Sequence, residues 1–113
     1  MKLERELMRG AGPTAVLKLL SKHEMYGYEL VEELAKQTDG VLAMGQSTLY
    51  PMLYNLEAKD LVEANWRSAD NGRDRKYYSL TGKGKKKLKA DMEAWAKLVD
   101  AMSSIGVLKG APA

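Results

Sequence analysis

The chain has 113 residues, 45% apolar and 29% charged, which is the composition of one soluble globular domain with room for an extension, not of a disordered segment. It has no cysteine, which excludes disulfides, thiolate zinc sites and cysteine nucleophiles, and its single histidine is too few for the usual zinc sites, so we expect no metal and no cofactor. No apolar run approaches the length of a bilayer, and the first ten residues lack the apolar core of a signal peptide, so we expect a cytoplasmic protein without a membrane contact.

The net charge of +3 is unevenly distributed along the chain. Residues 1–66 hold seven Lys/Arg and ten Asp/Glu, net −3, whereas residues 67–89 hold nine and two, net +7. Residues 90–113 hold two and three, net −1. A short basic segment in a mildly acidic chain indicates a localised anionic partner such as phosphate, although a solvated basic face gives the same pattern.

The first helices are indicated by apolar residues at helical spacing. Leu3 and Leu7 begin a short amphipathic helix, and residues 13–23 predict a longer one that starts at Pro13, a residue suited to a first turn. Residues 26–40 predict a second amphipathic helix that closes at Gly40. Its apolar face is made by Leu30, Val31 and Leu34.

The stretch "STLYPMLYNLEAKDLV", residues 47–62, predicts a third helix with two different faces. Its buried stripe follows the i, i+3, i+4, i+7 rule: Leu49, Met52, Leu53 and Leu56. The opposite arc holds Ser47, Tyr50, Pro51, Tyr54, Asn55 and Ala58. Because Ser47 or Thr48 can cap the helix, we expect Pro51 at about the first turn, where its missing N–H costs little.

A β-hairpin follows the third helix. Residues 61–68 and 75–80 are rich in β-branched and aromatic residues, and they flank a turn that contains the pair Asn71-Gly72. Three helices followed by a hairpin is the order of a winged helix-turn-helix, in which the third helix enters the DNA major groove and the hairpin is the wing. The predicted fold is therefore mainly α with a β-hairpin wing.

The outward arc of the third helix carries chemistry suited to DNA. Phosphate oxygens can accept hydrogen bonds from four of its hydroxyls, those of Ser47, Thr48, Tyr50 and Tyr54. Asn55 can make a bidentate contact to adenine if it reaches the groove floor. Two alternatives stay open, because the ring of Tyr50 can instead pack against a neighbouring helix and an isolated asparagine often only faces water.

The wing and the segment after it are basic. Arg67, Arg73, Arg75 and Lys76 gather on the hairpin, where Arg73 and Arg75 are suited to a minor groove or to phosphates. Five lysines stand at the start of the predicted last helix: Lys83, Lys85, Lys86, Lys87 and Lys89. Because cations at a helix start oppose the helix dipole, this cluster also indicates a role outside its own helix. The alternatives are a solubilising hairpin with internal pairs to Asp70 and Asp74, and an unpaired lysine-rich surface.

The last helix has an apolar seam. Its residues are spaced 4, 3, 4, 3, which is typical of helix-on-helix packing: Leu88, Met92, Trp95, Val99 and Met102. A winged-helix core would be complete at about Leu80, so we divide the chain into a DNA-binding domain, residues 1–80, and a dimerisation helix and tail, residues 81–113. With the N-terminal helix, the seam predicts a homodimer that presents two recognition helices about one DNA turn, ~34 Å, apart. The alternative is that the last helix folds back onto its own domain.

In such a dimer, two Trp95 rings can lie close together across the two-fold axis. Indole faces separated by a gap form a slot for a flat aromatic effector, and the thioethers of Met92 and Met102 are adaptable enough to line it. Trp95 as a plain interface anchor is the open alternative.

Three blocks of the sequence resemble signatures of the PadR family of bacterial transcriptional regulators. They are "YGYELVEEL", "GQSTLYPMLYNLEAKDLVEANW" and "GRDRKYYSLTGKG", and the resemblance covers residues 14–84, while the last helix with its tryptophan is similar to the short-helix branch of the family. The resemblance implies a homodimeric repressor that binds an inverted-repeat operator and is released by small molecules such as phenolic acids or drug-like aromatics. It assigns recognition-helix roles to Ser47, Thr48, Tyr50 and Pro51, and wing roles to Gly72, Arg73, Arg75, Lys76 and Tyr77.

Two rival functions come from other classes. An enzyme is disfavoured, because His23 stands between a lysine and a glutamate and the chain has no cysteine, phosphate-binding glycine loop or nucleophile elbow. A winged helix that serves only as a protein-interaction module stays open, because a fold does not assign a function. The basic wing and lysine cluster favour nucleic acid.

Overall fold

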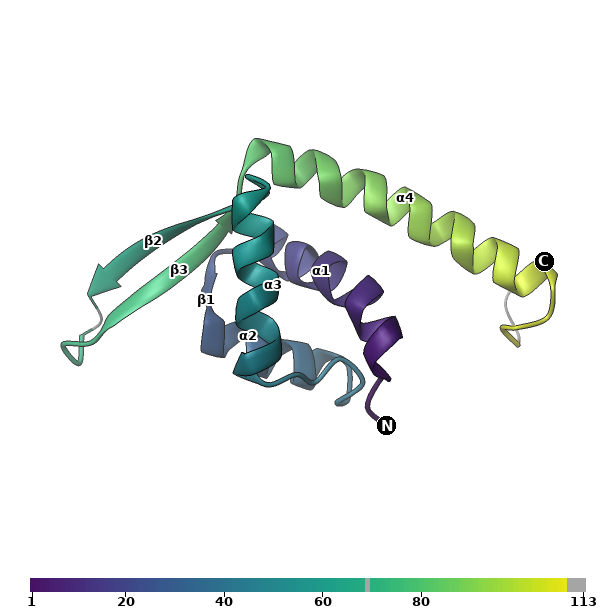
Figure 1. Cartoon of the computed structure of the whole chain (residues 1–113), viewed down its shortest axis with the longest axis horizontal. Helices are drawn as coiled ribbons and strands as arrows, with labels where there is room; N and C mark the ends of the chain where they lie inside the picture. Colours follow the sequence, from purple (N-terminus) through teal and green to yellow (C-terminus); the bar gives the residue numbers. More distant parts are fainter. Residues whose placement is uncertain (69, 110–113) are drawn as a thin grey trace.

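The computed structural model describes residues 1–68 and 70–109, so Ala69 of the predicted turn and residues 110–113 of the predicted tail lie outside the described residues. The elements follow in the order helix α1 (Arg5–Lys22), strand β1 (Met25–Tyr26), helices α2 (Gly27–Gln37) and α3 (Gln46–Ala58), strands β2 (Val62–Ser68) and β3 (Asp74–Leu80), and helix α4 (Gly82–Ser104) (Figure 1). The chain is mainly helical with a β-hairpin wing, which confirms the predicted fold class.

One small antiparallel sheet joins three strands in the order β1-β3-β2. Strands β2 and β3 form the predicted wing and pair along their whole length, and Gly72 in their turn has a φ of 80°, a conformation that glycine adopts without strain. Strand β1 is not predicted by the sequence, because a two-residue strand is too short to show an alternation of apolar and polar residues.

The hydrophobic core lies between α1, α2, α3 and one face of the sheet. Tyr78 of β3 and Val62 of β2 reach it from the sheet and are almost fully buried. The predicted apolar faces of the second and third helices are confirmed, because the buried side chains there are Leu30, Leu34, Leu49, Leu53 and Leu56, with Val31 and Met52 packed beside them. This packing holds α2 and α3 in the relative orientation of a helix-turn-helix.

The expectation that a helix begins at Pro13 is wrong. Helix α1 begins at Arg5, where the Glu4 carboxylate accepts a hydrogen bond from the Leu7 amide, and it continues through Pro13 as a single helix. Pro13 costs the helix one backbone hydrogen bond but has a helical φ. Buried residues on both sides of the proline, from Met8 to Leu20, outweigh that loss.

Helix α3 also starts earlier than the sequence predicts. Its first residue is Gln46, and the carbonyl of Gly45 accepts hydrogen bonds from the amides of Thr48 and Leu49, so neither Ser47 nor Thr48 caps the helix. Pro51 consequently lies inside the helix, beyond the first turn. The burial of the leucine stripe fixes the start of α3, and the local preference of proline does not.

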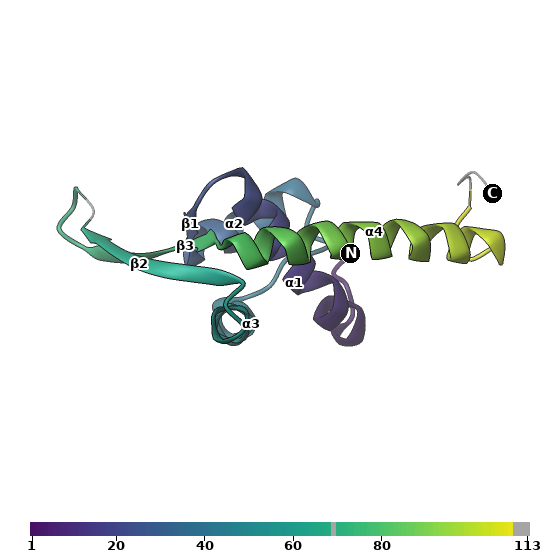
Figure 2. The ribbon, with the colours of Figure 1, turned by 90° about the horizontal axis from the view of Figure 1, so that it is seen from above.

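Helix α4 starts within the core and then leaves the rest of the molecule. Gly84 and Leu88 are buried, so the core extends beyond Leu80, whereas the C-terminal half runs outward past α1 (Figure 2). This projection gives the molecule its elongated dimensions of 53 × 31 × 21 Å. Within residues 1–68 and 70–109, no helix combines the length and apolar character needed to cross a membrane.

Candidate nucleic-acid interface

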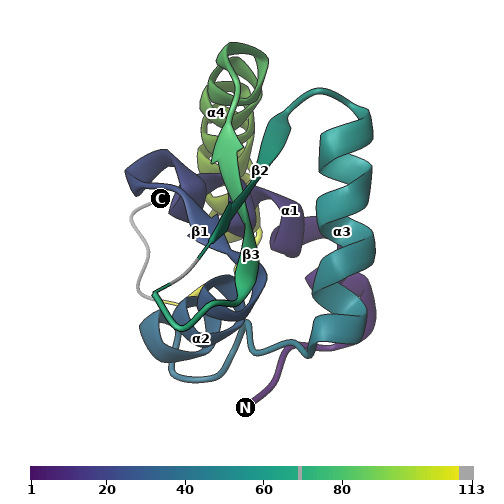
Figure 3. The ribbon, with the colours of Figure 1, turned by 90° about the vertical axis from the view of Figure 1, so that its left-hand side faces the viewer.

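Helix α3 lies at one side of the molecule, next to the wing in the view of Figure 3. Five of the six predicted recognition-helix residues are exposed: Ser47, Thr48, Pro51, Tyr54 and Asn55. Their hydroxyl and amide groups are therefore accessible from one side of the molecule, while the leucine stripe anchors the opposite face of the helix in the core.

Tyr50 lies between these two faces and is only partly exposed. Its ring centroid is 6.1 Å from that of Tyr54, and its hydroxyl lies against Gly27, the first residue of α2. A Cβ at position 27 would stand only 2.5 Å from the Tyr50 hydroxyl oxygen, so a larger residue there would displace the Tyr50 ring. Tyr50 thus sets the spacing between α2 and α3, in agreement with the alternative that its ring packs against a neighbouring helix.

Lys76 links the wing to α3. Its ammonium lies 3.7 Å from a Glu57 carboxylate oxygen and 5.4 Å from the ring centroids of both Tyr54 and Tyr78. Partial burial acts to lower the pKa of Lys76, but Tyr78, Glu57 and Tyr54 together outweigh it, so its pKa lies above the ordinary lysine value. Burial raises the pKa of the Tyr78 hydroxyl, which Lys76 only partly offsets. At neutral pH this predicted DNA contact is therefore a cation held over a neutral tyrosine.

The other face of the wing carries a continuous series of ionic and aromatic contacts. The Arg67 guanidinium donates to both carboxylate oxygens of Glu24, one of them at 2.7 Å, and lies 4.9 Å from the Tyr77 ring centroid. Tyr77 meets Tyr26 edge to face at 5.5 Å, and the Arg75 guanidinium covers Tyr26 at 4.5 Å. These contacts fasten the wing to the segment before α2.

The tip of the wing lies at the end of the hairpin away from the core (Figure 1). Arg73 is exposed there, its amide donates to the Asn71 side chain at 3.1 Å, and Ser68 donates to Asp74 at 3.0 Å across the hairpin. Among the described residues, Arg73 has no ion-pair partner and Asp70 and Asp74 form no ion pairs. In the part of the wing that the structure describes, the arginines and lysine therefore do not form the ion pairs with Asp70 and Asp74 that the alternative required.

The lysine cluster stands at the start of α4, next to the base of the wing. All five lysines are exposed, and the helix start has no acidic residue in its first turn; the Thr81 hydroxyl caps it by accepting from the Gly84 amide at 2.9 Å. Lys87 differs from the others, because its ammonium lies 2.7 Å from an Asp91 carboxylate oxygen.

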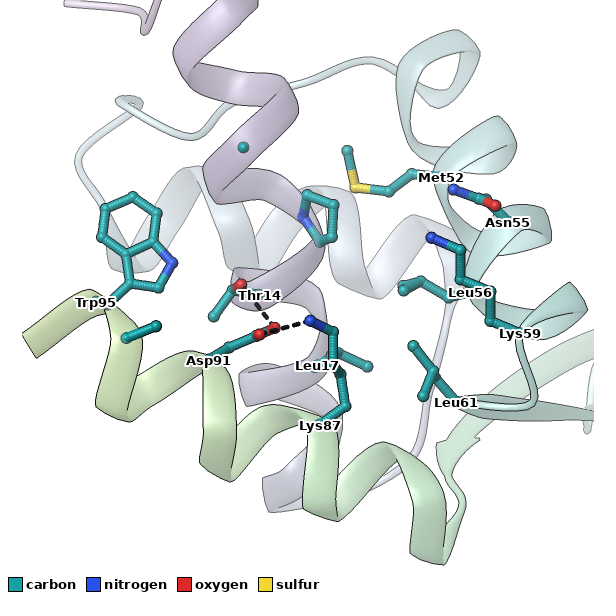
Figure 4. Close-up of a pocket in the computed structure, with 13 residues that line it drawn as sticks. Thr14, Leu17, Met52, Asn55, Leu56, Lys59, Leu61, Lys87, Asp91 and Trp95 are labelled. Carbon is teal, nitrogen blue, oxygen red and sulfur yellow. Dashed lines mark hydrogen bonds and ion pairs between the residues drawn. The ribbon is translucent and has the colours of Figure 1, made fainter. Parts of the chain in front are cut away.

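Asp91 and Lys87 border a hollow of about 290 Å³ between α1, α3 and α4 (Figure 4). The Thr14 hydroxyl donates to the other Asp91 oxygen at 3.2 Å, and Trp95 lines the same hollow one turn farther along α4. Met92, predicted to share a site with Trp95, lines a different depression with Leu88. Within one protomer the structure therefore does not bring these two predicted effector residues into one cavity.

The rest of the predicted seam is exposed. Met92, Trp95 and Val99 are 47%, 38% and 41% exposed, and Met102 is half-buried, whereas Leu88 is 6% exposed. The folding back of α4 onto its own domain thus holds for its first part only. Among the described residues, the apolar stripe from Met92 onward is therefore mostly exposed, and Trp95 and Met102 are covered only in part.

These features define the class of protein. A helix-turn-helix with an outward polar arc, a basic wing beside it and a projecting apolar helix is a winged helix-turn-helix of the kind that binds DNA. The chain belongs to the transcriptional regulator PadR-like family, whose model matches residues 16–90, and members of this family are transcriptional regulators and not enzymes.

Individual relatives agree with this assignment. The transcriptional regulator Rv3488 of Mycobacterium tuberculosis is 34% identical over 94 residues, which cover 83% of this chain and 84% of that protein. A PadR-like transcriptional regulator from Bacillus cereus superposes with a TM-score of 0.79 at 26% identity, over 95% of this chain and all of that one (100%). Bacillus subtilis PadR, solved in complex with operator DNA, shares the fold with a TM-score of 0.67 at 24% identity, over 73% of this chain and 45% of that one.

Proposed function

We propose that the protein is a homodimeric repressor that binds an inverted-repeat operator in double-stranded DNA and is released by a small aromatic effector. The observation that carries the DNA-binding part is the exposure, on one side of the molecule, of the polar arc of α3 beside the basic wing. The operator complex of Bacillus subtilis PadR, which shares this fold, supports it.

Each part of the interface has a distinct role in this proposal. The exposed hydroxyls and amide of α3 enter the major groove, where hydroxyls hold phosphates and Asn55 reads a base edge. Arg73 at the wing tip binds a phosphate or a minor groove, and Arg75 and Lys76 follow it along the wing. Tyr50 contributes mainly by holding α2 and α3 at the correct spacing.

Replacing two wing cations tests DNA binding. Arg73→Ala combined with Arg75→Ala is expected to weaken binding to all duplexes and to lower the slope of log affinity against log salt by about one or two, because up to two phosphate contacts are lost. Lys18→Ala with Lys22→Ala, at the far end of α1, removes the same charge as a control. An unchanged slope in fluorescence-anisotropy titrations would remove the wing from the interface. If the wild-type protein shows no salt-dependent binding to duplex DNA, the protein-interaction module is favoured.

The dimer in this proposal forms through residues 81–113, chiefly the exposed stripe from Met92 to Met102. A stripe of this length pairs with its own copy in a two-fold dimer, because each residue near the axis meets its symmetry mate. The N-terminal helix, by contrast, offers mostly Leu7 for such contacts, since Leu3 and Met8 pack against the core of their own protomer.

The effector part of the proposal depends on Trp95. A planar aromatic compound between two Trp95 rings would change the spacing of the recognition helices, and it regulates only if it binds the DNA-free and DNA-bound forms with different affinity. Because Trp66 also fluoresces, the measurement uses a Trp66→Phe background, in which Trp95 is the only tryptophan.

We expect planar aromatics to quench Trp95 at micromolar concentration. Trp95→Ala is expected to lose ligand binding, measured by calorimetry, while remaining dimeric in sedimentation. A monomeric Trp95→Ala variant, or no quenching by a broad panel of aromatics, would make Trp95 an interface anchor and contradict an effector site there.

A further inference from the structure

A second hollow, of about 720 Å³, lies on the side of α3 that faces away from the wing. It is bounded by the N-terminal segment with the start of α1, by residues 43–44, and by the outer arc of α3. Figures 1 and 3 both show the N-terminus beside the end of α3 at which that helix begins. The floor is apolar and is formed mostly by Leu3, Met8, Pro13, Met44 and Met52.

The charged residues that line this hollow all have the same sign. Lys2, Arg5 and Arg9 line it and are exposed, whereas the acids of the same segment, Glu4 and Glu6, do not line it. Glu4 is occupied in capping α1. Arg5 and Arg9 are four residues apart, so they lie one above the other on one face of α1.

The position of Arg5 also requires an explanation. It is the first residue of α1, where the helix dipole favours acids and disfavours cations. In the described chain, Arg5 has no ion-pair partner, and Arg9 reaches only Glu6 at 3.9 Å, with both side chains more than 70% exposed. Contacts within the described chain therefore do not explain why Arg5 and Arg9 stand at these positions.

The same hollow is lined by three residues of the candidate DNA surface, Thr48, Pro51 and Asn55. On its other side, α3 meets the wing, where Tyr54 lies against Lys76. The recognition helix thus runs between two basic flanks, the wing on one side and the start of α1 on the other. An α-helix about 10–12 Å across fits the major groove, whose two walls are both phosphate backbones.

We propose that Arg5 and Arg9, with Lys2 beside them, bind DNA phosphates on the wall of the major groove opposite the wing. This inference rests on the proposed DNA-binding function and adds a contact surface to it. The start of α1 then positions the protein on DNA without reading sequence, because phosphate contacts carry no base information.

The test compares two double variants of α1. Arg5→Ala/Arg9→Ala removes the proposed contacts, and Lys18→Ala/Lys22→Ala removes the same net charge from the same helix at its other end. We expect the first variant to lower the salt slope by about two and to weaken binding to operator and unrelated duplexes alike by tenfold or more, because about 0.9 of a unit is lost per phosphate. The control variant is expected to keep the wild-type slope.

Several outcomes separate this inference from the function on which it rests. Equal slopes for the two double variants would overturn it, since the effect would then come from net charge alone. If the wing variant lowers the slope and Arg5→Ala/Arg9→Ala does not, the DNA-binding function stands and the α1 contact is wrong. If the wild-type protein binds no duplex in a salt-dependent way, both fail. Thermal unfolding of each variant verifies that α1 is intact.

Discussion

The two halves of α4 carry the same apolar spacing but have opposite surroundings. In the first half, Gly84 and Leu88 are buried and Asp91 bonds to α1, whereas in the second half Trp95 and Val99 stay exposed as the helix leaves the body (Figure 2). The regular apolar spacing alone therefore does not show which part of the helix the protomer itself buries. In this protein one seam is buried in the core of the protomer at its start and is exposed farther on, where the proposed dimer would use it.

The close approach of the first half depends on a glycine. A Cβ at Gly84 would collide with the backbone carbonyl of Leu61, which precedes β2. Glycine thus lets the helix begin directly against the base of the wing, and the Leu61 carbonyl also accepts a hydrogen bond from the Thr81 amide at 3.2 Å. The second half has no such constraint and contains none of the buried residues of α4.

The largest effect is expected at Leu88. Leu88→Ala leaves a cavity in the core of the protomer and should lower the free energy of unfolding by about 2–5 kcal/mol. Met92→Ala, one turn farther along the same seam, is the matched control, because that side chain is 47% exposed and its truncation opens no cavity in the core. Urea denaturation of both variants measures the difference. Equal destabilisation would mean that the two halves share one environment.

A smaller effect is expected at Val99, on self-association. Val99→Asp puts a charge in the proposed dimer interface and should raise the dimer dissociation constant at least tenfold, about 1.4 kcal/mol. Ala101→Asp adds the same charge to the opposite side of the helix and should leave the dimer intact. Analytical ultracentrifugation over a range of concentrations distinguishes the two. A Val99→Asp variant as dimeric as wild type would move the interface elsewhere.

Local patterns in the sequence were sufficient for much of the fold. The repeat of Leu49, Leu53 and Leu56 predicts the buried face of α3, and Asn71-Gly72 predicts the turn of the wing. The starts of α1 and α3 differ from the predicted ones, because proline preference is a local rule and burial of the neighbouring apolar residues overrides it.

The candidate site was less predictable, because it depends on pairs that are distant in sequence. Arg67 reads as one more wing cation, yet it binds Glu24, 43 residues away. Tyr50 reads as a free hydroxyl on a polar arc, and only the packing of α2 shows that Gly27 lies against it. The basic start of α1 is not evident in the sequence, because its cations alternate with acids along the chain. Only in the folded helix do the cations and the acids lie on different faces.

The smallest effect is expected where the two halves of α4 meet. The Thr14 hydroxyl and the Lys87 ammonium both bond to Asp91, the last residue of α4 that the body holds by a hydrogen bond (Figure 4). Thr14→Val removes the link between α1 and α4 at nearly constant volume and should cost about 1 kcal/mol. Lys87→Ala removes a pair within α4 and should cost less, about 0.3–0.5 kcal/mol.

Thermal unfolding of the two variants, with the double variant to complete the cycle, tests this ranking. If Thr14→Val costs more, the hydrogen bond between helices fixes the point at which α4 departs from the body, and the exposed stripe beyond it is held at a defined angle. If Lys87→Ala costs more, Asp91 serves mainly its own helix. The departure of α4 would then depend on Leu88 and Gly84 alone, and the angle of the proposed dimer would be set by apolar packing.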